Sequence, residues 1–300
     1  MPDTGNQFKK GGILLVLGLL AINVFWGASF IANAIALKYV GPIEIASVRF
    51  FIAVPILLVV TFLLKGKEIF KFDFKDAGLL LVIALTGVTF QYIVQVTAQE
   101  YTTATNVSLL INTSVFFIMF MGALWLGEKM TPARLIGAVV GFVGVAFLVT
   151  GGSLAFDLGG HVTGDIMALA SGLMWAIYSI CSKKLAPKYD PLVLLNYIFL
   201  VGAICMIPFY LVMPHTAIQD IPMTAMAAIL FLAIFCSIIA YFVYNLALEK
   251  MEASSVALFI YIVPLATIIL AILVLGEKLT FSAAIGGFLI LAGMYLAERK

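Results

Sequence analysis

The stretch Leu126-Gly127-Glu128-Lys129-Met130-Thr131 returns 149 residues later as Leu275-Gly276-Glu277-Lys278-Leu279-Thr280. Around it, residues 98–147 and 247–296 align at the same offset without gaps, and 15 of 50 positions are identical. Self-similarity at one fixed offset is typical of a duplicated structural unit. We therefore expect a chain built from two related halves.

Each half is apolar enough to lie in a membrane. Hydrophobic residues make up 64% of the chain and charged residues 11%, whereas about 25% charged residues is usual in a soluble domain. A helix needs about 20 mostly apolar residues to cross the hydrocarbon. The runs that fit lie at 13–34, 45–64, 77–96, 104–126, 135–150, 166–182, 192–213, 223–246, 256–275 and 283–296. The sequence predicts an all-α membrane protein with ten transmembrane helices, in two five-helix repeats (residues 1–150 and 151–300) around a central cavity.

An odd number of spans in each half means that the second half must enter the membrane from the opposite side. Equivalent linkers then lie on opposite faces and should differ in positive charge. The linker after the second run has four lysines, whereas its equivalent, 214–222, has none. The linker after the sixth run has three lysines, whereas its equivalent has Lys38 alone. The halves are therefore predicted to be inverted repeats, which are typical of secondary transporters.

The charges also predict the orientation. With ten spans both termini lie on one face, and 14 of the 17 Lys and Arg residues fall on that face; the others are Lys38, Arg49 and Lys278. The positive-inside rule places that face in the cytoplasm. We expect a multi-pass protein of the inner (plasma) membrane with both termini cytoplasmic.

Other classes of protein find little support in the sequence. Lys9 and Lys10 precede an apolar run, as in a signal peptide, but no small-residue cleavage site follows. The three cysteines lack metal-ligand spacing, and no metal or cofactor is predicted. A membrane-embedded lipid-modifying enzyme would need clustered acids, a metal or an activated nucleophile, and no such pattern is visible. The expected partners are a small solute and the lipid bilayer, not nucleic acid, and the protein is expected to be a monomer or a homodimer.

Polar residues inside the third run form one stripe. Gln91, Gln95 and Gln99 are four residues apart, and this spacing puts them on one face of a helix. Amides suit an uncharged or zwitterionic solute because each offers a donor and an acceptor. Hydrogen bonding between helices would also use glutamine; we favour a cavity.

Aromatic residues recur at equivalent positions in the two halves. Trp26 and Trp175 are equivalents in mid-span, and so are Tyr92 and Tyr241. Such residues are also common in packing, so packing and solute contact both stay open. The residues predicted to contact the solute are Trp26, Asn33, Gln91, Tyr92, Gln95, Gln99, Asn112, Trp175, Tyr178, Tyr241, Tyr244 and Tyr261.

Three further residues are assigned to gating or structure. Arg49 lies about a turn and a half inside the second run, where it could hold a solute carboxylate, pair with Glu44 or reach the outer surface. A five-residue separation suits an Arg49–Glu44 pair less well than a separation of four, and we interpret both as gating or structural residues. Pro264 is expected to kink the ninth run. No carboxylate is visible in mid-span, which leaves proton coupling and facilitated diffusion both open.

These fragments, in order and in duplicate, resemble the drug/metabolite transporter superfamily, in particular its EamA-type ten-span branch. The similarity covers nearly the whole chain. It rests on Phe25-Trp26-Gly27-Ala28-Ser29-Phe30, Arg49-Phe50, Gly164-Asp165, Trp175-Ala176-Ile177-Tyr178-Ser179, Glu252-Ala253-Ser254, Pro264 and both copies of Leu-Gly-Glu-Lys. The family often has a second proline in the fourth span, where this chain has Val115, so no proline kink is expected there.

The resemblance implies export of small metabolites, often amino acids, across the inner membrane by alternating access. Export of other amphipathic solutes or drugs is the alternative, and uptake of the same solutes stays open. A phosphate carrier should place several cations in its cavity, and a cation exporter usually needs a buried acid. Neither pattern is present in the predicted spans.

Overall fold

The structure, a computed structural model, describes residues 11–102, 104–150, 162–275 and 281–298. Within these ranges the chain is helical and forms no strand. Up to residue 150 the helices are α1 (Gly11–Ala36), α2 (Pro42–Lys65), α3 (Ala77–Ala84), α4 (Phe90–Tyr101), α5 (Ala104–Ile111), α6 (Ser114–Leu126) and α7 (Pro132–Val149). In the second half they are α8 (Val162–Leu185), α9 (Pro191–Val212), α10 (Met223–Phe231), α11 (Ala240–Lys250), α12 (Ala253–Leu258), α13 (Ile262–Leu275) and α14 (Phe281–Glu298). Short 3-10 turns η2 (Gly66–Phe70), η3 (Phe74–Asp76) and η5 (Ile218–Asp220) lie in the links.

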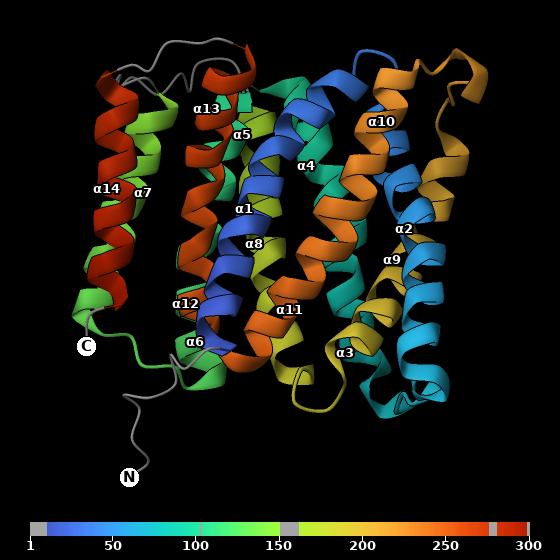
Figure 1. Cartoon of the computed structure of the whole chain (residues 1–300), viewed down its shortest axis with the longest axis horizontal. Coiled ribbons are helices and arrows are strands. Elements are labelled where there is room, and N and C mark those ends of the chain that lie inside the picture. The colour runs from blue at the N-terminus through green and yellow to red at the C-terminus, as the bar shows by residue number, and fades with distance from the viewer. Residues whose placement is uncertain (1–10, 103, 151–161, 276–280, 299–300) are drawn as a thin grey trace.

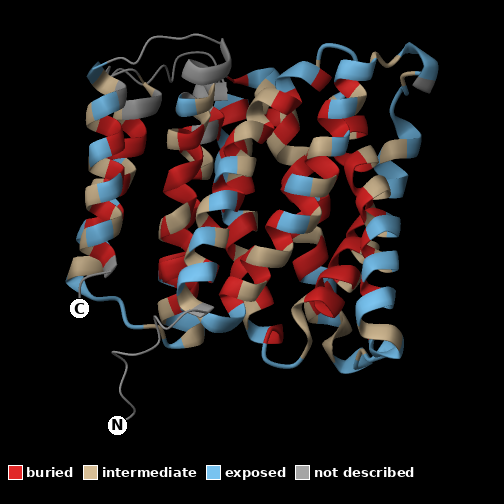
Figure 2. Ribbon diagram, in the orientation of Figure 1, coloured by how far each residue is buried: buried red, intermediate tan, exposed pale blue. Residues whose placement is uncertain are grey.

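Seven helices in the described ranges are long and apolar enough to cross a membrane. They cover Gly12–Ala36, Pro42–Phe70, Phe74–Tyr101, Leu109–Leu126, Val162–Leu185, Pro191–Val212 and Met223–Lys250. Three shorter apolar helices cover Pro132–Phe147, Ala253–Thr267 and Ala284–Ala297. Exposed apolar side chains cover the outside of the bundle, among them Leu63 (76% exposed) and Phe288 (71% exposed), as Figure 2 shows for the helix faces. So wide an apolar surface belongs in lipid, and the chain is a multi-pass membrane protein, as predicted.

Two of the described membrane helices change register midway. α3 continues into α4 through a π-helical segment, η4 (Leu85–Thr89), and α10 continues into α11 through another, η6 (Leu232–Ile239). Gly87 in the first segment and Cys236 in the second are 149 residues apart. The register therefore shifts at equivalent places in the two halves. Such π segments are frequent at functional sites.

Two further helices are interrupted at equivalent places. The 3-10 turn η7 (Phe259–Tyr261) separates α12 from α13, and Pro264 lies in the first turn of α13, where a proline is tolerated. Asn112 and Thr113 separate α5 from α6, although no proline is present. There the Thr113 hydroxyl donates to the Leu110 carbonyl oxygen at 2.5 Å, which offers the backbone a local partner in place of the helix. Both copies are therefore interrupted, whereas the sequence predicts a kink only at Pro264.

Figure 1 shows the helices side by side, with their ends on two opposite edges of the bundle. α1 begins and α14 ends at the lower edge of this view. The links from α2 to α3, α6 to α7, α8 to α9 and α11 to α12 also lie at the lower edge. The links from α1 to α2, α4 to α5 and α9 to α10 lie at the upper edge. The terms lower edge and upper edge are used in this sense below.

Glycines bring α7 and α14 together at one side of the bundle (Figure 1). A Cβ atom added at Gly137 would lie 2.4 Å from the backbone nitrogen of Ala297, and one at Gly144 would lie 2.7 Å from that of Ile290. Only a residue without a side chain permits so close an approach. The glycines in these helices therefore allow close packing, and neither helix lines the cavity described below.

Candidate functional site

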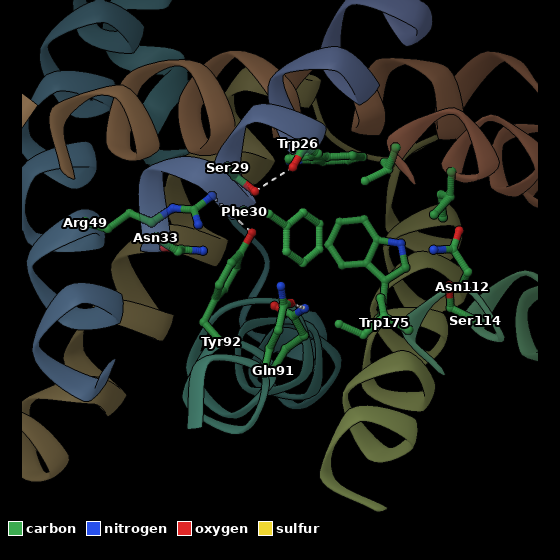
Figure 3. Close-up of a pocket in the computed structure, with 14 residues that line it drawn as sticks. Trp26, Ser29, Phe30, Asn33, Arg49, Gln91, Tyr92, Asn112, Ser114 and Trp175 are labelled. Atoms are coloured by element: carbon green, nitrogen blue, oxygen red, sulfur yellow. Dashed lines mark hydrogen bonds between the residues drawn. The ribbon is translucent and has the colours of Figure 1, made fainter. Parts of the chain in front are cut away.

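A cavity lies in the middle of the bundle, between α1, α2, α4, α8 and the two interrupted helices α5–α6 and α12–α13 (Figure 3). Its volume is about 70 Å³, enough for several water molecules, since one needs about 10–15 Å³ in the same terms. The residues that line it are Trp26, Ser29, Phe30, Asn33, Arg49, Gln91, Tyr92, Gln95, Ile111, Asn112, Ser114, Trp175, Ile260 and Val263. Arg49 is the one charged residue among them. The lining thus combines aromatic rings, neutral amides and a single positive charge.

Trp26 and Trp175 meet in the wall of the cavity. Their ring centroids are 5.4 Å apart, and the rings stand edge to face at 87°. The Trp26 indole donates from Nε1 to the carbonyl oxygen of Cys236 at 3.1 Å. Trp175 stacks on Tyr178 with a centroid distance of 5.0 Å. Both indoles are therefore held in fixed orientations where they line the cavity.

Three tyrosines fill the bundle between the tryptophans and the lower edge. Tyr178, Tyr241 and Tyr244 are each at most 1% exposed, and we call them the tyrosine cluster. α8 runs from the upper edge to the lower edge, so Tyr178 lies about 4.5 Å below Trp175 along the helix. The Tyr178 hydroxyl accepts from Asn245 Nδ2 at 2.6 Å. Because these rings are packed together and buried, they close the cavity toward the lower edge.

The two π-helical segments supply hydrogen-bond acceptors to this region. The carbonyl oxygen of Gly87 accepts from the Tyr241 hydroxyl at 2.6 Å, and that of Cys236 accepts from Trp26. In each case the acceptor lies in one half and the aromatic donor in the other. Gly87 also leaves room for the cluster, because a Cβ atom there would lie 2.1 Å from the ring of Tyr178. The equivalent π segments thus fix aromatic residues on both sides of the centre.

Two members of the predicted glutamine stripe reach the cavity. Gln91 and Gln95 line it, and Gln91 Nε2 donates to Gln95 Oε1 at 2.6 Å. Gln91 Oε1 has no hydrogen-bond partner among the described residues, although the side chain is only 4% exposed. Gln99, two turns closer to the upper edge than Gln91, is absent from the lining. The buried Gln91 oxygen is an acceptor that a solute in the cavity could use.

Arg49 reaches the cavity wall from α2 and is only 2% exposed. Its Nε donates to Ser237 Oγ at 2.5 Å, and its Nη2 donates to Tyr92 Oη at 3.1 Å. The guanidinium carbon also lies 4.3 Å from the centre of the Tyr92 ring, which is a cation–π contact. These partners come from η6 and α4, so Arg49 links three elements at the cavity.

Glu44 does not pair with Arg49. Both of its carboxylate oxygens accept from the backbone nitrogen of Thr216, each at 3.2 Å. Thr216 lies in the link between α9 and α10 at the upper edge, and Glu44 is only 4% exposed. Of the alternatives considered for Arg49, the pair with Glu44 is therefore absent, and Glu44 ties α2 to a link of the other half.

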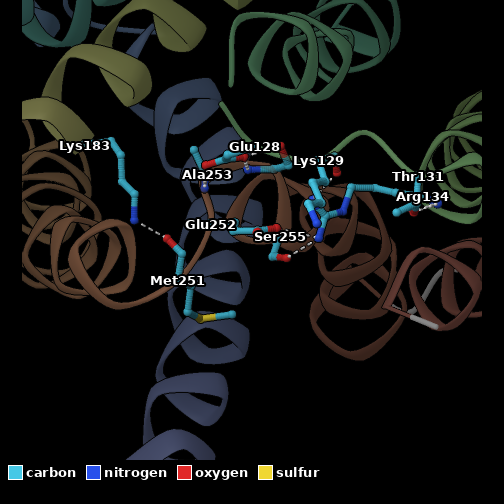
Figure 4. A network of polar contacts seen from close by, with 10 residues as sticks. Glu128, Lys129, Thr131, Arg134, Lys183, Met251, Glu252, Ala253 and Ser255 are labelled. Atoms are coloured by element: carbon cyan, nitrogen blue, oxygen red, sulfur yellow. Dashed lines mark hydrogen bonds and ion pairs between the residues drawn. The ribbon is translucent and has the colours of Figure 1, made fainter. Parts of the chain in front are cut away.

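Glu128 joins the two halves at the lower edge (Figure 4). Gly127 has a φ of 69° and ends α6 in the left-handed conformation that favours glycine. The next residue, Glu128, accepts from the backbone nitrogens of Ala253 at 2.6 Å and Ser254 at 3.0 Å. These nitrogens begin α12, where the helix dipole favours a negative charge. The repeated Gly-Glu motif thus forms a contact between halves in its first copy; Gly276 and Glu277 lie outside the described residues.

Two cations make further contacts beside Glu128, Arg134 between the halves and Lys183 within the second half. Arg134 Nη2 lies 2.6 Å from a carboxylate oxygen of Glu252. Lys183 Nζ donates to the carbonyl oxygens of Leu248 and Met251, each at 2.5 Å, at the end of α11. We refer to the contacts of Glu128, Arg134 and Lys183 as the lower latch. Glu128 and Arg134 join the two halves, whereas Lys183 joins α8 to the end of α11 within the second half. These contacts lie on the side of the cavity that faces the lower edge, as does the tyrosine cluster.

The structure brings together part of the set predicted to contact the solute. Those that line the cavity are Trp26, Asn33, Gln91, Tyr92, Gln95, Asn112 and Trp175. Those outside the lining are Gln99, Tyr178, Tyr241, Tyr244 and Tyr261. Tyr261 donates to the carbonyl oxygen of Ala138 at 3.0 Å, so its hydroxyl ties η7 to α7. Pro264 is buried at the start of α13 and is also outside the lining.

Other lining residues are missing from the predicted set. They are Ser29, Phe30, Ile111, Ser114, Ile260 and Val263, together with Arg49, which the sequence assigns to gating. Ser29 and Phe30 follow Trp26 by three and four residues, so helical periodicity places them on the same face. Ser114 follows the break between α5 and α6, and nothing in the composition marks that break.

A bundle of helices apolar enough to cross a membrane, around a cavity lined by aromatic rings, amides and one cation, is the architecture of a membrane transporter. The chain belongs to the EamA-like transporter family, whose model matches residues 11–150 and 162–298. The resemblance to the drug/metabolite transporter superfamily is confirmed by this match and by the names of the relatives, which are transporters and not enzymes.

Relatives from distant organisms are similar over most of the chain. An uncharacterized transporter from Archaeoglobus fulgidus is 39% identical over 97% of this chain and 98% of its own. A probable amino-acid metabolite efflux pump from Escherichia coli is 27% identical over 96% of this chain and 94% of its own. A probable terminal-alkyne amino-acid exporter from Streptantibioticus cattleyicolor is 26% identical over 75% of this chain and 74% of its own. A solved crystal structure, 18% identical, shares the fold with a TM-score of 0.81 over 95% of this chain and 96% of that one.

Proposed function

We propose that the protein exports small metabolites, above all amino acids, across the inner membrane by alternating access. The observation that carries this proposal is a cavity in mid-bundle, lined by aromatic and amide side chains and Arg49, whose Trp175 packs on the buried tyrosine cluster on the side of the lower edge. A channel would offer a continuous path between the edges, whereas a cavity closed at one end suits a carrier that opens to one side at a time. The present conformation is the one closed to the lower edge.

Two inverted five-helix repeats, residues 1–150 and 151–300, would give ten crossings related by a pseudo-twofold axis. Residues related by such an axis touch each other only if they lie close to it. Three aromatic pairs with the 149-residue separation are in contact. They are Trp26–Trp175 (centroids 5.4 Å apart), Phe50–Phe199 (5.1 Å) and Tyr92–Tyr241 (6.4 Å). We place the axis through these pairs, beside the cavity, where inverted repeats of transporters form their solute sites.

The orientation follows from the charge of the two edges. The described cations in the links and helix ends of the lower edge are Lys65, Lys67, Lys71, Lys75, Lys129, Arg134, Lys183, Lys184, Lys188 and Lys250. Lys38 lies at the upper edge. Under the positive-inside rule the lower edge, with both termini, faces the cytoplasm. The conformation described here is then the one closed to the cytoplasm.

The lining suits a small zwitterion with an apolar side chain. Trp26, Phe30 and Trp175 offer aromatic surface, while Asn33 and Gln91 offer amide donors and acceptors. No acid lines the cavity among the residues that the structure describes, which argues against export of cations. Two of the relatives carry names of amino-acid exporters or efflux pumps, in agreement with this solute class. Other amphipathic solutes or drugs would fit the same aromatic walls and are the second candidate.

The test is efflux from proteoliposomes loaded with a panel of radiolabelled amino acids. We expect saturable efflux of at least one member, with a marked loss in Trp26→Ala and in Gln95→Ala. Trp125→Ala and Gln219→Ala are matched controls, because both residues are exposed and outside the lining. If folded, monodisperse wild-type protein moves no amino acid, the amino-acid assignment fails, and nucleosides and hydrophobic drugs form the next panel.

A further inference from the structure

Arg49 is a buried cation with no carboxylate partner among the described residues. Its hydrogen bonds go to the hydroxyls of Ser237 and Tyr92, and Glu44, the acid closest to it in sequence within α2, is bound to Thr216 instead. A charge taken out of water is costly unless an opposite charge accompanies it. A site with a buried and uncompensated cation therefore favours an anion that enters from the cavity.

The hydrogen bonds of Arg49 leave its outer edge free. A guanidinium has five N–H donors, of which Ser237 takes the one on Nε and Tyr92 takes one on Nη2. Three donors, including both on Nη1, have no partner among the described residues. The two terminal nitrogens form the fork that binds a carboxylate through two parallel hydrogen bonds. Figure 3 shows this end of Arg49 beside Asn33 and Tyr92, at the wall that faces the cavity.

The remaining lining indicates a monoanion that also carries an ammonium group. A phosphate would call for several cations, and Arg49 is the one cation in the lining within the described part of the chain. An ammonium group could donate to Gln91 Oε1, the buried acceptor without a partner. The faces of Trp26 and Trp175 attract a cation as well. A solute with one carboxylate at Arg49 and one ammonium group near Gln91 is a zwitterion with no net charge. Its binding would therefore leave the net charge of the cavity unchanged.

We propose that Arg49 recognises the carboxylate of the solute, so that a free carboxylate is required for binding, and that Ser237 and Tyr92 position the guanidinium. The inference rests on the proposed transport of amino acids and adds the chemical group that the site selects. It assigns to Arg49 a part in specificity beyond gating or structure.

The experiment compares amino acids with their amides, which differ only in the carboxylate. Binding of leucine, phenylalanine and threonine, and of leucinamide, phenylalaninamide and threoninamide, is measured through the fluorescence of the cavity tryptophans in purified protein. In the wild type we expect at least one acid to bind about 10-fold or more tightly than its amide, as a charge-assisted hydrogen bond implies. Arg49→Gln should abolish that preference, and Arg49→Lys should retain part of it, because the charge remains and the fork is lost.

The ratio of the affinities for acid and amide is measured within one protein sample. A smaller folded fraction in a variant therefore affects both affinities equally and leaves their ratio unchanged. Lys67→Gln is the matched control, because it removes an exposed cation that lies outside the cavity and outside the lower latch, and its ratio should equal that of the wild type. Equal affinity for acid and amide in the wild type, or an unchanged ratio in Arg49→Gln, would overturn the inference and leave amino-acid transport standing. If no acid or amide binds and none is moved in the flux assay, both proposals fall together.

Discussion

The lower latch predicts how far one substitution, Glu128→Gln, shifts the protein toward its other conformation. The two carboxylate oxygens of Glu128 face the backbone N–H groups of Ala253 and Ser254. Glutamine has the same shape but one acceptor, so its NH₂ group would face an N–H donor. Hydrogen bonds to a charged group contribute about 1.5–3 kcal/mol, and Glu128 is half-buried, so we expect a loss of about 2 kcal/mol. If the latch forms only when the lower edge is closed, the population of the open conformation rises about 30-fold.

Thiol labelling from the lower side measures this population. Ser182 lies on α8 below the tyrosine cluster and is 0% exposed, so Ser182→Cys reacts only when the lower edge opens. The reporter is built in a chain whose native Cys181, Cys205 and Cys236 are replaced by alanine, and a membrane-impermeant maleimide is added on that side. With a minor open conformation, the labelling rate is proportional to its population. Glu128→Gln should therefore raise the rate about 30-fold.

A matched control separates the latch from a general effect of charge. Glu249 is exposed near the end of α11, at the same edge, and Glu249→Gln removes one negative charge there. We expect its labelling rate to stay at the level of the parent. Equal rates in Glu128→Gln and the parent would show that the latch does not hold the lower edge closed. Equal acceleration by both variants would assign the effect to surface charge instead.

Three further predictions concern packing and the extent of the cavity. Gly137→Ala should lower the free energy of unfolding by about 1–3 kcal/mol through overpacking, whereas Gly78→Ala, in open space, should leave the Tm unchanged or higher. Tyr261→Phe should lower stability by about 1 kcal/mol without changing KM for transport, because the residue is outside the lining; a changed KM would place it at the solute. Gln95→Leu should raise KM for transport, whereas Gln99→Leu should leave it unchanged. An equal increase of KM in both variants, measured in flux assays, would show that the solute site extends toward the upper edge.

The sequence suffices for the helices and for much of the cavity because both depend on local periodicity. Apolar runs of membrane length mark the spans, and residues spaced by three or four share a helix face. Gln91, Gln95 and Trp26 can be assigned to one cavity on that basis. Whether Tyr178 or Tyr244 touches a solute depends instead on which end of the cavity is closed. That is a property of the conformation of the whole bundle, and no local pattern encodes it.

Arg49 shows the other limit of reading the sequence. From the sequence its visible partner is Glu44, five residues away. In the structure its partners are Tyr92 and Ser237, which are 43 and 188 residues distant, and Ser237 lies in a π-helical segment. A π segment shifts the register of every residue after it, yet it has no characteristic composition. The face that Ser237 presents to α2 therefore cannot be derived from 3.6-residue periodicity.

The two halves share a scaffold but differ in chemistry, and the difference follows the two ends of the cavity. Lining residues and their equivalents 149 positions later are Ser29 and Tyr178, Gln95 and Tyr244, Asn112 and Tyr261, and Arg49 and Ile198. At these four positions, small, amide and cationic groups occupy the first half, and phenols or an alkyl chain occupy the second half. If the halves exchange roles when the lower edge opens, the same solute meets amides and a guanidinium in one conformation and phenols in the other. Under the proposed alternating access, duplication would supply the symmetric motion, and divergence of the lining would allow the solute to be held more tightly on one side of the membrane than on the other.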